Sequence, residues 1–379
     1  MSDENRTESD QRRVTPNNLM KTPRLYLIII SILLAGILLS ACAGGAGVAT
    51  SWPGLSVNGE TGYLAFNNHV YAINLANGTE LWRFPVETDN RVNFYAPPAS
   101  GNEQLLAGGY NNILYSLNPA DGATNWTFTG ATNRYVASPL ATEQSIYAPS
   151  SDGRLYVLDH NGTLRWEPFR SEHPLWATPV TDGSLVFQPA MDHHIYAFDA
   201  RDGKLVWQTE DLGGALVGTP TLGEDGVLYA GTFARELLAL DTQSGAVLNR
   251  YSTDGWVWSG PALEGDRLYF GDLDGFVYAL NTADFNEVWK IRPDTLPRQA
   301  ISEKPLVVED TVYVSSESGN LYAIDAANGN IRWPKTIGGR LHASPVLASD
   351  TILVTPLGIE SALVALDLNG NQKWTFTPQ

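Results

Sequence analysis

The sequence of 379 residues contains one cysteine, three methionines and six histidines, and these low numbers exclude several kinds of site. A single thiol, Cys42, cannot form a disulfide within the chain or build a zinc site with other cysteines. The Cys-x-x-Cys-His sequence that attaches a c-type haem is absent. Packing must therefore hold the fold together, even in an oxidising compartment.

Positive charge is also scarce. The chain has 24 Lys and Arg against 41 Asp and Glu, which gives a net charge of −17. This charge repels phosphate backbones and argues against nucleic-acid binding. It also disfavours broad electrostatic adhesion to anionic lipid.

Long apolar runs are absent except near the start. Residues 25–39, "LYLIIISILLAGILL", follow a segment that ends with Lys21 and Arg24, and "LSAC" ends at Cys42. This order of charged, apolar and small residues is typical of a signal peptide. Leu-Ser-Ala-Cys resembles a bacterial lipobox, in which the cysteine is acylated and becomes the first mature residue.

We therefore predict a lipoprotein signal peptide over 1–41, a lipidated Cys42 and a flexible linker within 42–51. The body of the protein would then lie outside the cytoplasm, anchored to the envelope by lipid. The alternative is a plain transmembrane anchor, because the apolar run is near the lower limit for a span.

No stretch after residue 51 has a convincing helical period, but one phrase recurs eight times. It consists of an apolar run, an Asp or Asn, a turn and a tryptophan, as in "LYAIDAANGNIRW". The phrases end at Trp82, Trp126, Trp166, Trp207, Asn249, Trp289, Trp333 and Trp374, so the period is about 42 residues. A proline opens an apolar run in phase with each phrase, at Pro53, Pro98, Pro139, Pro179, Pro220, Pro261, Pro305 and Pro345.

Each unit is predicted to contain four strands. In the seventh unit these are "EKPLVV", "TVYVSS", "NLYAID" and "IRWPKT", and a turn over 325–329 joins the last two. Proline suits the first residue of a strand because it has no N–H to donate. Eight such units predict an all-β, eight-bladed β-propeller of four-stranded antiparallel blades over 52–379. We expect the seven tryptophans to dock adjacent blades, with each indole N–H bonded to a neighbouring carbonyl.

The pattern Leu-Tyr-Ala-hydrophobic-Asp-x-x-x-Gly-x-hydrophobic-x-Trp resembles the quinoprotein tryptophan-docking repeat, also called the PQQ-like repeat. It does not match WD40 repeats, since neither Trp-Asp nor Gly-His occurs. Together with the lipobox, the single propeller is similar to the BamB family of periplasmic lipoproteins, which serve the outer-membrane β-barrel assembly machinery. The resemblance implies a non-catalytic, monomeric scaffold that contacts envelope proteins, such as a BamA-like assembly protein.

Two alternatives stay open. One is a propeller that binds PQQ or another small ligand, since PQQ-dependent dehydrogenases share this repeat and use calcium and often a cysteine pair. The chain lacks that pair and has no room for long insertions between blades, so we expect neither catalysis nor cofactor. The other is a recognition lipoprotein on the surface of a cell that lacks an outer membrane.

Several polar motifs are assigned to turns. The acidic residues of the repeats, Asp159, Asp199, Asp241, Asp325 and Asp367, fall in turns between strands. "GDLDG" over 271–275 lacks the later ligands of a calcium loop. His193 and His194 are expected in a solvated turn rather than at a metal, because neighbouring strand residues point to opposite faces.

The segments before the repeat prolines are rich in arginine and aromatic residues, and propeller geometry places them at one end of the ring. Their candidate binding residues are Arg91, Tyr95, Arg134, Tyr135, Trp176, Trp256, Trp258, Arg298, Arg340 and His342. Residues of these types are enriched at interface hot spots. The other interpretation is that they only plug the channel. Two departures from the repeat, Asn249 and Phe285, reflect either repeat drift or an altered groove between blades.

Overall fold

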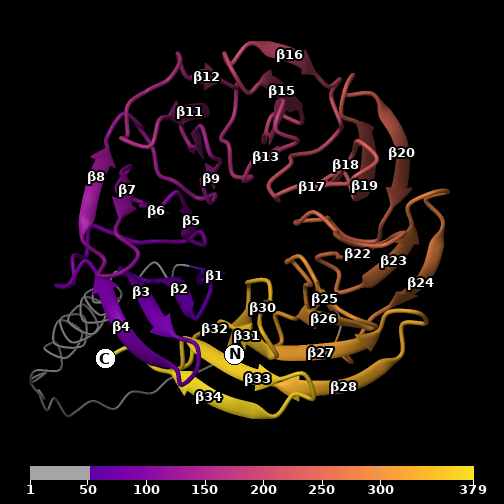
Figure 1. Ribbon diagram of the computed structural model, residues 1–379. Coiled ribbons are helices and arrows are strands. Elements are labelled where there is room, and N and C mark those ends of the chain that lie inside the picture. Colours follow the sequence, from indigo (N-terminus) through magenta and orange to yellow (C-terminus); the bar gives the residue numbers. More distant parts are fainter. Residues whose placement is uncertain (1–51, 297) are drawn as a thin grey trace, which may run out of the picture. The chain divides into compact units, whose positions relative to one another are not determined.

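The computed structural model describes residues 52–296 and 298–379, which form a ring of eight four-stranded sheets (Figure 1). The predicted signal peptide, Cys42 and the linker lie outside these residues. Every regular element in the described part of the chain is a strand, and none of its segments forms a helix that could cross a membrane. The prediction of an eight-bladed, all-β propeller is confirmed.

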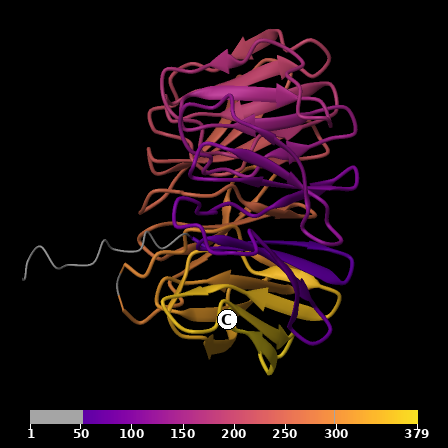
Figure 2. The same ribbon diagram turned by 90° about the vertical axis from the view of Figure 1, so that its left-hand side faces the viewer.

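The blades follow one another along the chain, and Figure 2 shows the ring from the side. Blade 1 contains β1 (Gly54–Asn58), β2 (Thr61–Phe66), β3 (His69–Asn74) and β4 (Thr79–Phe84); blade 2 contains β5 (Ala99–Gly101), β6 (Gln104–Gly108), β7 (Leu114–Leu117) and β8 (Thr124–Phe128); blade 3 contains β9 (Leu140–Ala141), β10 (Ile146–Pro149), β11 (Arg154–Leu158) and β12 (Phe169–Arg170); blade 4 contains β13 (Val180–Thr181), β14 (Leu185–Pro189), β15 (Ile195–Asp199) and β16 (Leu205–Gln208).

The second half of the ring repeats this arrangement. Blade 5 contains β17 (Thr221–Leu222), β18 (Val227–Thr232), β19 (Glu236–Asp241) and β20 (Val247–Ser252); blade 6 contains β21 (Ala262–Glu264), β22 (Arg267–Gly271), β23 (Val277–Asn281) and β24 (Glu287–Ile291); blade 7 contains β25 (Leu306–Val308), β26 (Thr311–Ser315), β27 (Asn320–Asp325) and β28 (Ile331–Thr336); blade 8 contains β30 (Val346–Ala348), β31 (Thr351–Val354), β33 (Leu363–Asp367) and β34 (Gln372–Phe376). A short ribbon of β29 (Arg340–Leu341) and β32 (Pro356–Leu357) lies beside blade 8.

The innermost strand of each blade lies at the centre of the ring and the fourth strand lies at the rim (Figure 1). The two middle strands are buried on both faces, because each blade packs against a neighbour on either side. This explains why strands such as β27 read as nearly continuous apolar runs. Rim strands such as β28 are half exposed and mix polar with apolar residues.

The core consists of eight apolar clusters, and each cluster draws its residues from two adjacent blades. Tryptophans in or just before the fourth strands bridge seven of these interfaces. The indole N–H of Trp82 donates to the carbonyl of Pro119 in blade 2 (3.0 Å), and that of Trp289 donates to Ala326 in blade 7 (3.0 Å). The bridging tryptophan therefore both fills apolar space and satisfies a carbonyl of a neighbouring turn.

The ring closes by packing between blades 8 and 1, and each of these blades is built from its own consecutive strands. One core cluster joins residues of both blades. The indole N–H of Trp374 donates to the carbonyl of Leu75 (3.1 Å), and the guanidinium of Arg83 donates to the carbonyl of Gln379 (2.9 Å). The last blade thus docks on the first by the same kind of tryptophan contact that joins most other neighbouring blades.

The two departures from the repeat meet at one interface. In most blades the turn glycine before the fourth strand lies directly under the tryptophan of the preceding blade: a Cβ at Gly122 would be 2.6 Å from Cε3 of Trp82. Between blades 5 and 6 the tryptophan is replaced by the exposed Asn249, and the glycine by Phe285. The Phe285 ring is 6% exposed and stacks on Tyr229, with centroids 6.4 Å apart.

Phe285 thus fills the space that an indole fills elsewhere. Tyr63, which holds the same strand position as Tyr229, contacts Trp82 in the corresponding way. The two substitutions compensate each other, and the altered groove considered from the sequence is occupied by this ring.

Candidate functional site

The segments before the repeat prolines converge on one end of the ring, which we call the mouth face. Each segment is extended, so successive side chains alternate in direction. Side chains four residues before the prolines are buried between blades: Phe94, Tyr135, Leu175, Leu216, Val257, Ile301 and Leu341. Side chains three residues before most of them line the channel: Tyr95, Val136, Trp176, Val217, Trp258 and His342.

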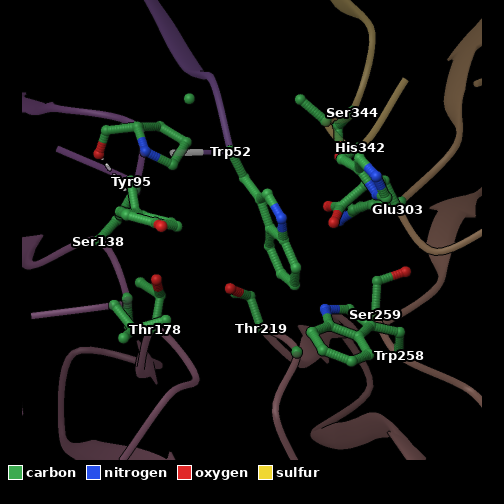
Figure 3. A pocket seen from close by; sticks show the side chains of 18 of the residues that line it. Trp52, Tyr95, Ser138, Thr178, Thr219, Trp258, Ser259, Glu303, His342 and Ser344 are labelled. Carbon is green, nitrogen blue, oxygen red and sulfur yellow. Dashed lines mark hydrogen bonds between the residues drawn. The ribbon is translucent and has the colours of Figure 1, made fainter. Parts of the chain in front are cut away.

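These inward residues enclose a cavity of about 380 Å³ at the mouth of the central channel, which we call the mouth cavity (Figure 3). All eight units contribute to its lining. Trp52 comes from the start of the described chain and projects into the middle of the view in Figure 3. It is 37% exposed, so the cavity is open to solvent on the mouth face.

Aromatic rings form much of the wall. The Trp52 indole stacks on the His342 imidazole, with centroids 5.5 Å apart and planes 12° from parallel. The same indole meets Trp258 edge to face at 5.4 Å. Trp176 is fixed by a hydrogen bond from its indole N–H to Oγ of Ser151 (3.0 Å). These contacts hold three indoles in defined orientations around the cavity.

Hydroxyl groups also line the cavity. They come from Ser138, Thr178, Thr219, Ser259 and Ser344, at or next to the residue that precedes each repeat proline. They can donate and accept hydrogen bonds, so the lining is apolar with a ring of small polar groups. Such a combination is usual in sites for small ligands.

An acidic side chain and two basic ones line the mouth cavity: Glu303, Lys304 and His342. Glu303 is half-buried in the channel wall, and desolvation there raises the pKa of its carboxyl to about 8, although a hydrogen bond with Ser344 opposes the rise. Desolvation by the protein around it lowers the pKa of Lys304, a residue that is nevertheless partly open to solvent and whose Nζ donates to Oγ1 of Thr221 (3.2 Å). Burial also lowers the pKa of His342, whose Nδ1 lies 3.3 Å from a carboxylate oxygen of Glu317.

Lys304 separates the mouth cavity from a second one. Its side chain extends from blade 7 to Thr221 in blade 5, and it lines both cavities. The second cavity, of about 730 Å³, is lined by blades 5, 6 and 7 and carries the acidic residues Glu224, Asp225 and Glu264.

The predicted binding residues divide into three groups. Tyr95, Trp176, Trp258 and His342 line the mouth cavity. Arg91, Arg134, Trp256, Arg298 and Arg340 are exposed. Trp256 is 46% exposed and stacks on Phe233 at 4.8 Å. Arg134 lies over the Tyr110 ring, which stacks on Tyr95.

Tyr135 belongs to the third group, and its assignment to the binding face is corrected. It is 1% exposed and packs in the cluster between blades 2 and 3, against Gly108. The reason is alternation: Tyr135 is four residues before Pro139, whereas Tyr95 is three before Pro98. One residue of offset sends the side chain into the core instead of the channel.

The sequence reasoning missed Trp52, Glu303, Lys304 and the hydroxyl ring. A signal for most of them was present, because they lie at fixed positions before the repeat prolines. The third residue before most repeat prolines, and the residue directly before several of them, have side chains that line the mouth cavity. These positions can be read from the sequence alone. Glu303 is harder to select, because it is two residues before Pro305, where most units have a small residue.

The other polar motifs are structural. His193 Nδ1 lies 3.1 Å from a carboxylate oxygen of Asp211, and His194 Nδ1 lies 2.9 Å from the carbonyl of Thr209, so the two rings face different partners. Asp272, in the 271–275 segment, accepts hydrogen bonds from the N–H groups of Gly255 and Phe276. Among the residues that the structure describes, no group of three His, Cys, Asp or Glu side chains could hold a metal ion.

The mouth cavity is a poor fit for a calcium-bound quinone. Calcium needs six to eight oxygen ligands, normally with several carboxylates. The cavity offers one carboxylate, Glu303, whose raised pKa keeps it largely protonated at neutral pH. Its walls hold no cysteine pair either, because Cys42 is the only cysteine in the sequence.

The fold and its repeats define the class of this protein: a β-propeller of tryptophan-docked, PQQ-like blades. The family model "Outer membrane protein assembly factor BamB" matches residues 67–188, 191–308 and 299–379. The chain belongs to this family.

Curated relatives are more distant and more varied. BamB of Yersinia pestis is 24% identical over 51% of this chain and 52% of its own length. Tetrathionate hydrolase of Acidithiobacillus ferrooxidans is 25% identical over 42% of this chain and 36% of its own length. The matches thus span about half or less of the curated relatives' own length, and two of these relatives are named as enzymes, the hydrolase and the serine/threonine-protein kinase AfsK of Streptomyces coelicolor.

Among solved structures, BamB from Moraxella catarrhalis superposes with a TM-score of 0.69 and 17% identity, covering 80% of this chain and 92% of that one. At this identity the likeness shows the fold alone.

Proposed function

We propose that this protein is a non-catalytic scaffold of the cell envelope that assists the assembly of outer-membrane proteins. The observation that carries the proposal is the family match, which covers almost the whole propeller from residue 67 to residue 379. In this proposal the chain is tethered by lipid on Cys42 and acts by docking other proteins on a rigid ring, without a quinone or a metal.

Two surfaces could carry the docking. The mouth face exposes Trp256, stacked on Phe233, and other pre-proline segments contribute exposed arginines. Tryptophan and arginine are the residue types that most often dominate interface energetics. We propose that an envelope partner, such as a BamA-like assembly protein, contacts this patch.

The rim offers a different mode. The outer strands β4, β16, β20 and β28 have one unpaired edge, and each presents exposed aliphatic side chains: Leu81, Leu205, Val206, Leu248 and Ile331. An unpaired edge with apolar side chains can accept an extended segment as a further strand. Unfolded β-barrel clients consist of such segments, which suits a scaffold for their assembly.

The test is photo-crosslinking in native membranes. A crosslinking amino acid is placed at Trp256 and, separately, at Trp176, and the captured proteins are identified by mass spectrometry. Asn161, exposed in the turn before the fourth strand of blade 3, serves as the control position. Capture of an outer-membrane assembly protein at Trp256 but not at Asn161 supports the proposal. If only unrelated surface proteins are captured by a folded propeller, the assembly role is wrong.

The tether has its own test. Metabolic labelling with radioactive palmitate should label the wild-type chain and not a Cys42→Ala variant, and the variant should be released from membranes. A labelled Cys42→Ala chain would contradict lipidation at this residue. Release without loss of the crosslink at Trp256 would show that tether and docking act separately.

The cell-surface alternative concerns the compartment rather than the fold. Protease added to intact cells should leave the chain intact if it faces the periplasm and should degrade it if it faces the medium.

A further inference from the structure

We infer that the mouth cavity is a binding site for a small organic cation, an alkylammonium or guanidinium group held with the aromatic rings of the cavity wall on one side and the carboxylate of Glu303 on the other. This inference does not depend on the proposed scaffold role. It rests on the shape of the cavity, the chemistry of its walls and the isolation of one acidic group.

The size and accessibility of the cavity suit a small ligand. Its volume of about 380 Å³ lies within the usual range for small-molecule sites. Trp52 at its centre is partly exposed, so a ligand can enter from the mouth face. Rings from blades 4, 6 and 8 line it in orientations already fixed by hydrogen bonds and stacking. A preformed site of this kind loses little entropy on binding.

The aromatic walls favour positive charge. The faces of indole rings are electron-rich and attract ammonium and guanidinium groups, and the attraction grows when water is excluded. Trp52, Trp176 and Trp258 contribute three indoles, and Tyr95 adds a phenol ring. The same rings could hold an apolar molecule, so the sign of the ligand's charge must be decided by the remaining groups.

Glu303 decides it. The carboxyl is half-buried in the channel wall, and its hydrogen-bond partner is the hydroxyl of Ser344 rather than a cation. Lys304, the adjacent residue, also lines the mouth cavity, but its Nζ donates to Oγ1 of Thr221, a residue that lines the second cavity. His342 pairs with Glu317 on its other side. A bound cation would supply the missing charge partner, whereas an anion would meet Glu303 without compensation.

The hydroxyl ring and the net charge agree with this assignment. Oxygens of Ser138, Thr178, Thr219 and Ser259 can accept hydrogen bonds from the N–H groups of a cation. The chain as a whole carries a charge of −17, which raises the local concentration of cations and lowers that of anions.

The experiment compares choline with 3,3-dimethyl-1-butanol, its uncharged isostere, by tryptophan fluorescence and calorimetry on the purified full chain at pH 8.5 and constant ionic strength. We expect choline to bind at least tenfold more tightly than the alcohol. The binding of agmatine and of the peptide Gly-Arg-Gly amide is measured in the same way. Tighter binding of agmatine would indicate a free, metabolite-sized cation, and tighter binding of the peptide would indicate an arginine side chain of another protein.

Glu303→Gln is the decisive variant, and Glu264→Gln in the second cavity is its matched control. Glu303→Gln should reduce the preference for choline over the alcohol to less than twofold, while Glu264→Gln should leave it unchanged. Thermal unfolding of both variants verifies that they are folded. Equal binding of the two isosteres by the wild type, binding of neither, or an unaltered preference in Glu303→Gln would each overturn the inference.

Discussion

The interface between blades 1 and 2 and the interface between blades 5 and 6 solve the same packing problem in opposite ways. In the first, the large ring is Trp82 on the rim strand of one blade and the small residue is Gly122 in the turn of the next. In the second, the rim strand carries the small Asn249 and the turn carries the large Phe285.

What is preserved is the filled volume against the strand-two tyrosine, Tyr63 or Tyr229. The turn geometry is preserved as well. The N–H of Gly122 donates to the carbonyl of Asn118, and that of Phe285 donates to the carbonyl of Asn281. Phe285 accordingly adopts a left-handed backbone with φ of 57°, close to the 73° of Gly122. The comparison shows that every blade interface needs a large ring in this space. Either of the two blades can supply that ring.

The largest loss of stability is expected when both blades of one interface carry a large ring. Gly122→Phe forces atoms into the Trp82 indole, since even a Cβ would be 2.6 Å from it. We expect a loss of about 4 kcal/mol or more in the free energy of unfolding. The double variant Trp82→Asn with Gly122→Phe should recover about 2 kcal/mol of it in urea unfolding. No recovery would show that the two positions are not interchangeable.

The next largest loss of stability is expected when a docking indole is removed and no other ring takes its place. Trp289→Ala deletes the most buried of the docking indoles and its hydrogen bond to Ala326, and should cost about 3–5 kcal/mol. Asn249→Ala, at the matching position of blade 5, is the control and should stay within about 0.5 kcal/mol of wild type. Similar losses for both substitutions would mean that the indole contributes no more than the exposed amide.

A smaller effect on stability is expected when the tryptophan and glycine of the other interfaces are introduced between blades 5 and 6. Asn249→Trp alone should destabilise the chain because Phe285 already fills the space, and Phe285→Gly alone should leave a cavity. Combined, they should show a favourable coupling of about 1–3 kcal/mol in a double-mutant cycle followed by thermal unfolding. Purely additive effects would contradict the compensation.

The smallest effect concerns the mouth cavity and depends on pH. The pKa of Glu303 is raised to about 8 in the fold, above the value near 4.5 that it has when unfolded. The native state therefore holds the proton more tightly, and stability falls as pH rises from about 4.5 towards 8. Glu303→Gln removes this penalty. It should be more stable than wild type by about 1–2 kcal/mol at pH 8.5 and equal to it at pH 4.5.

Glu303 is hydrogen-bonded to Ser344, and Lys304 and His342, the latter paired with Glu317, line the same cavity. A gain that is constant across this pH range would point to packing rather than to the carboxyl. Unfolding midpoints at several pH values distinguish these outcomes.

Most of the fold could be predicted from the sequence because its signals are periodic. The in-phase tryptophans and prolines give the number of blades, and the alternating strands within one period give four strands per blade. The compensation between Asn249 and Phe285 could not be recognised, because the two residues belong to different units and meet only across a blade interface.

The positions of several candidate residues could be predicted, whereas their role in binding stays a prediction. The composition of the pre-proline segments indicated one end of the ring, and the structure places Tyr95, Trp176, Trp258 and His342 in the cavity lining there. Tyr135 was misplaced because composition ignores the direction in which alternate residues point. Glu303 was missed because an acidic residue in an acidic chain carries no signal until its burial is known.

Trp52 marks where the described chain enters the ring, and it does so at the channel mouth. The tether proposed upstream of this residue would therefore be attached near the axis of the ring and not at its rim. A ring tethered near its axis can rotate about that axis while each outer strand stays at the same distance from it. Eight rim edges would then be presented in succession to a partner that stays in one place.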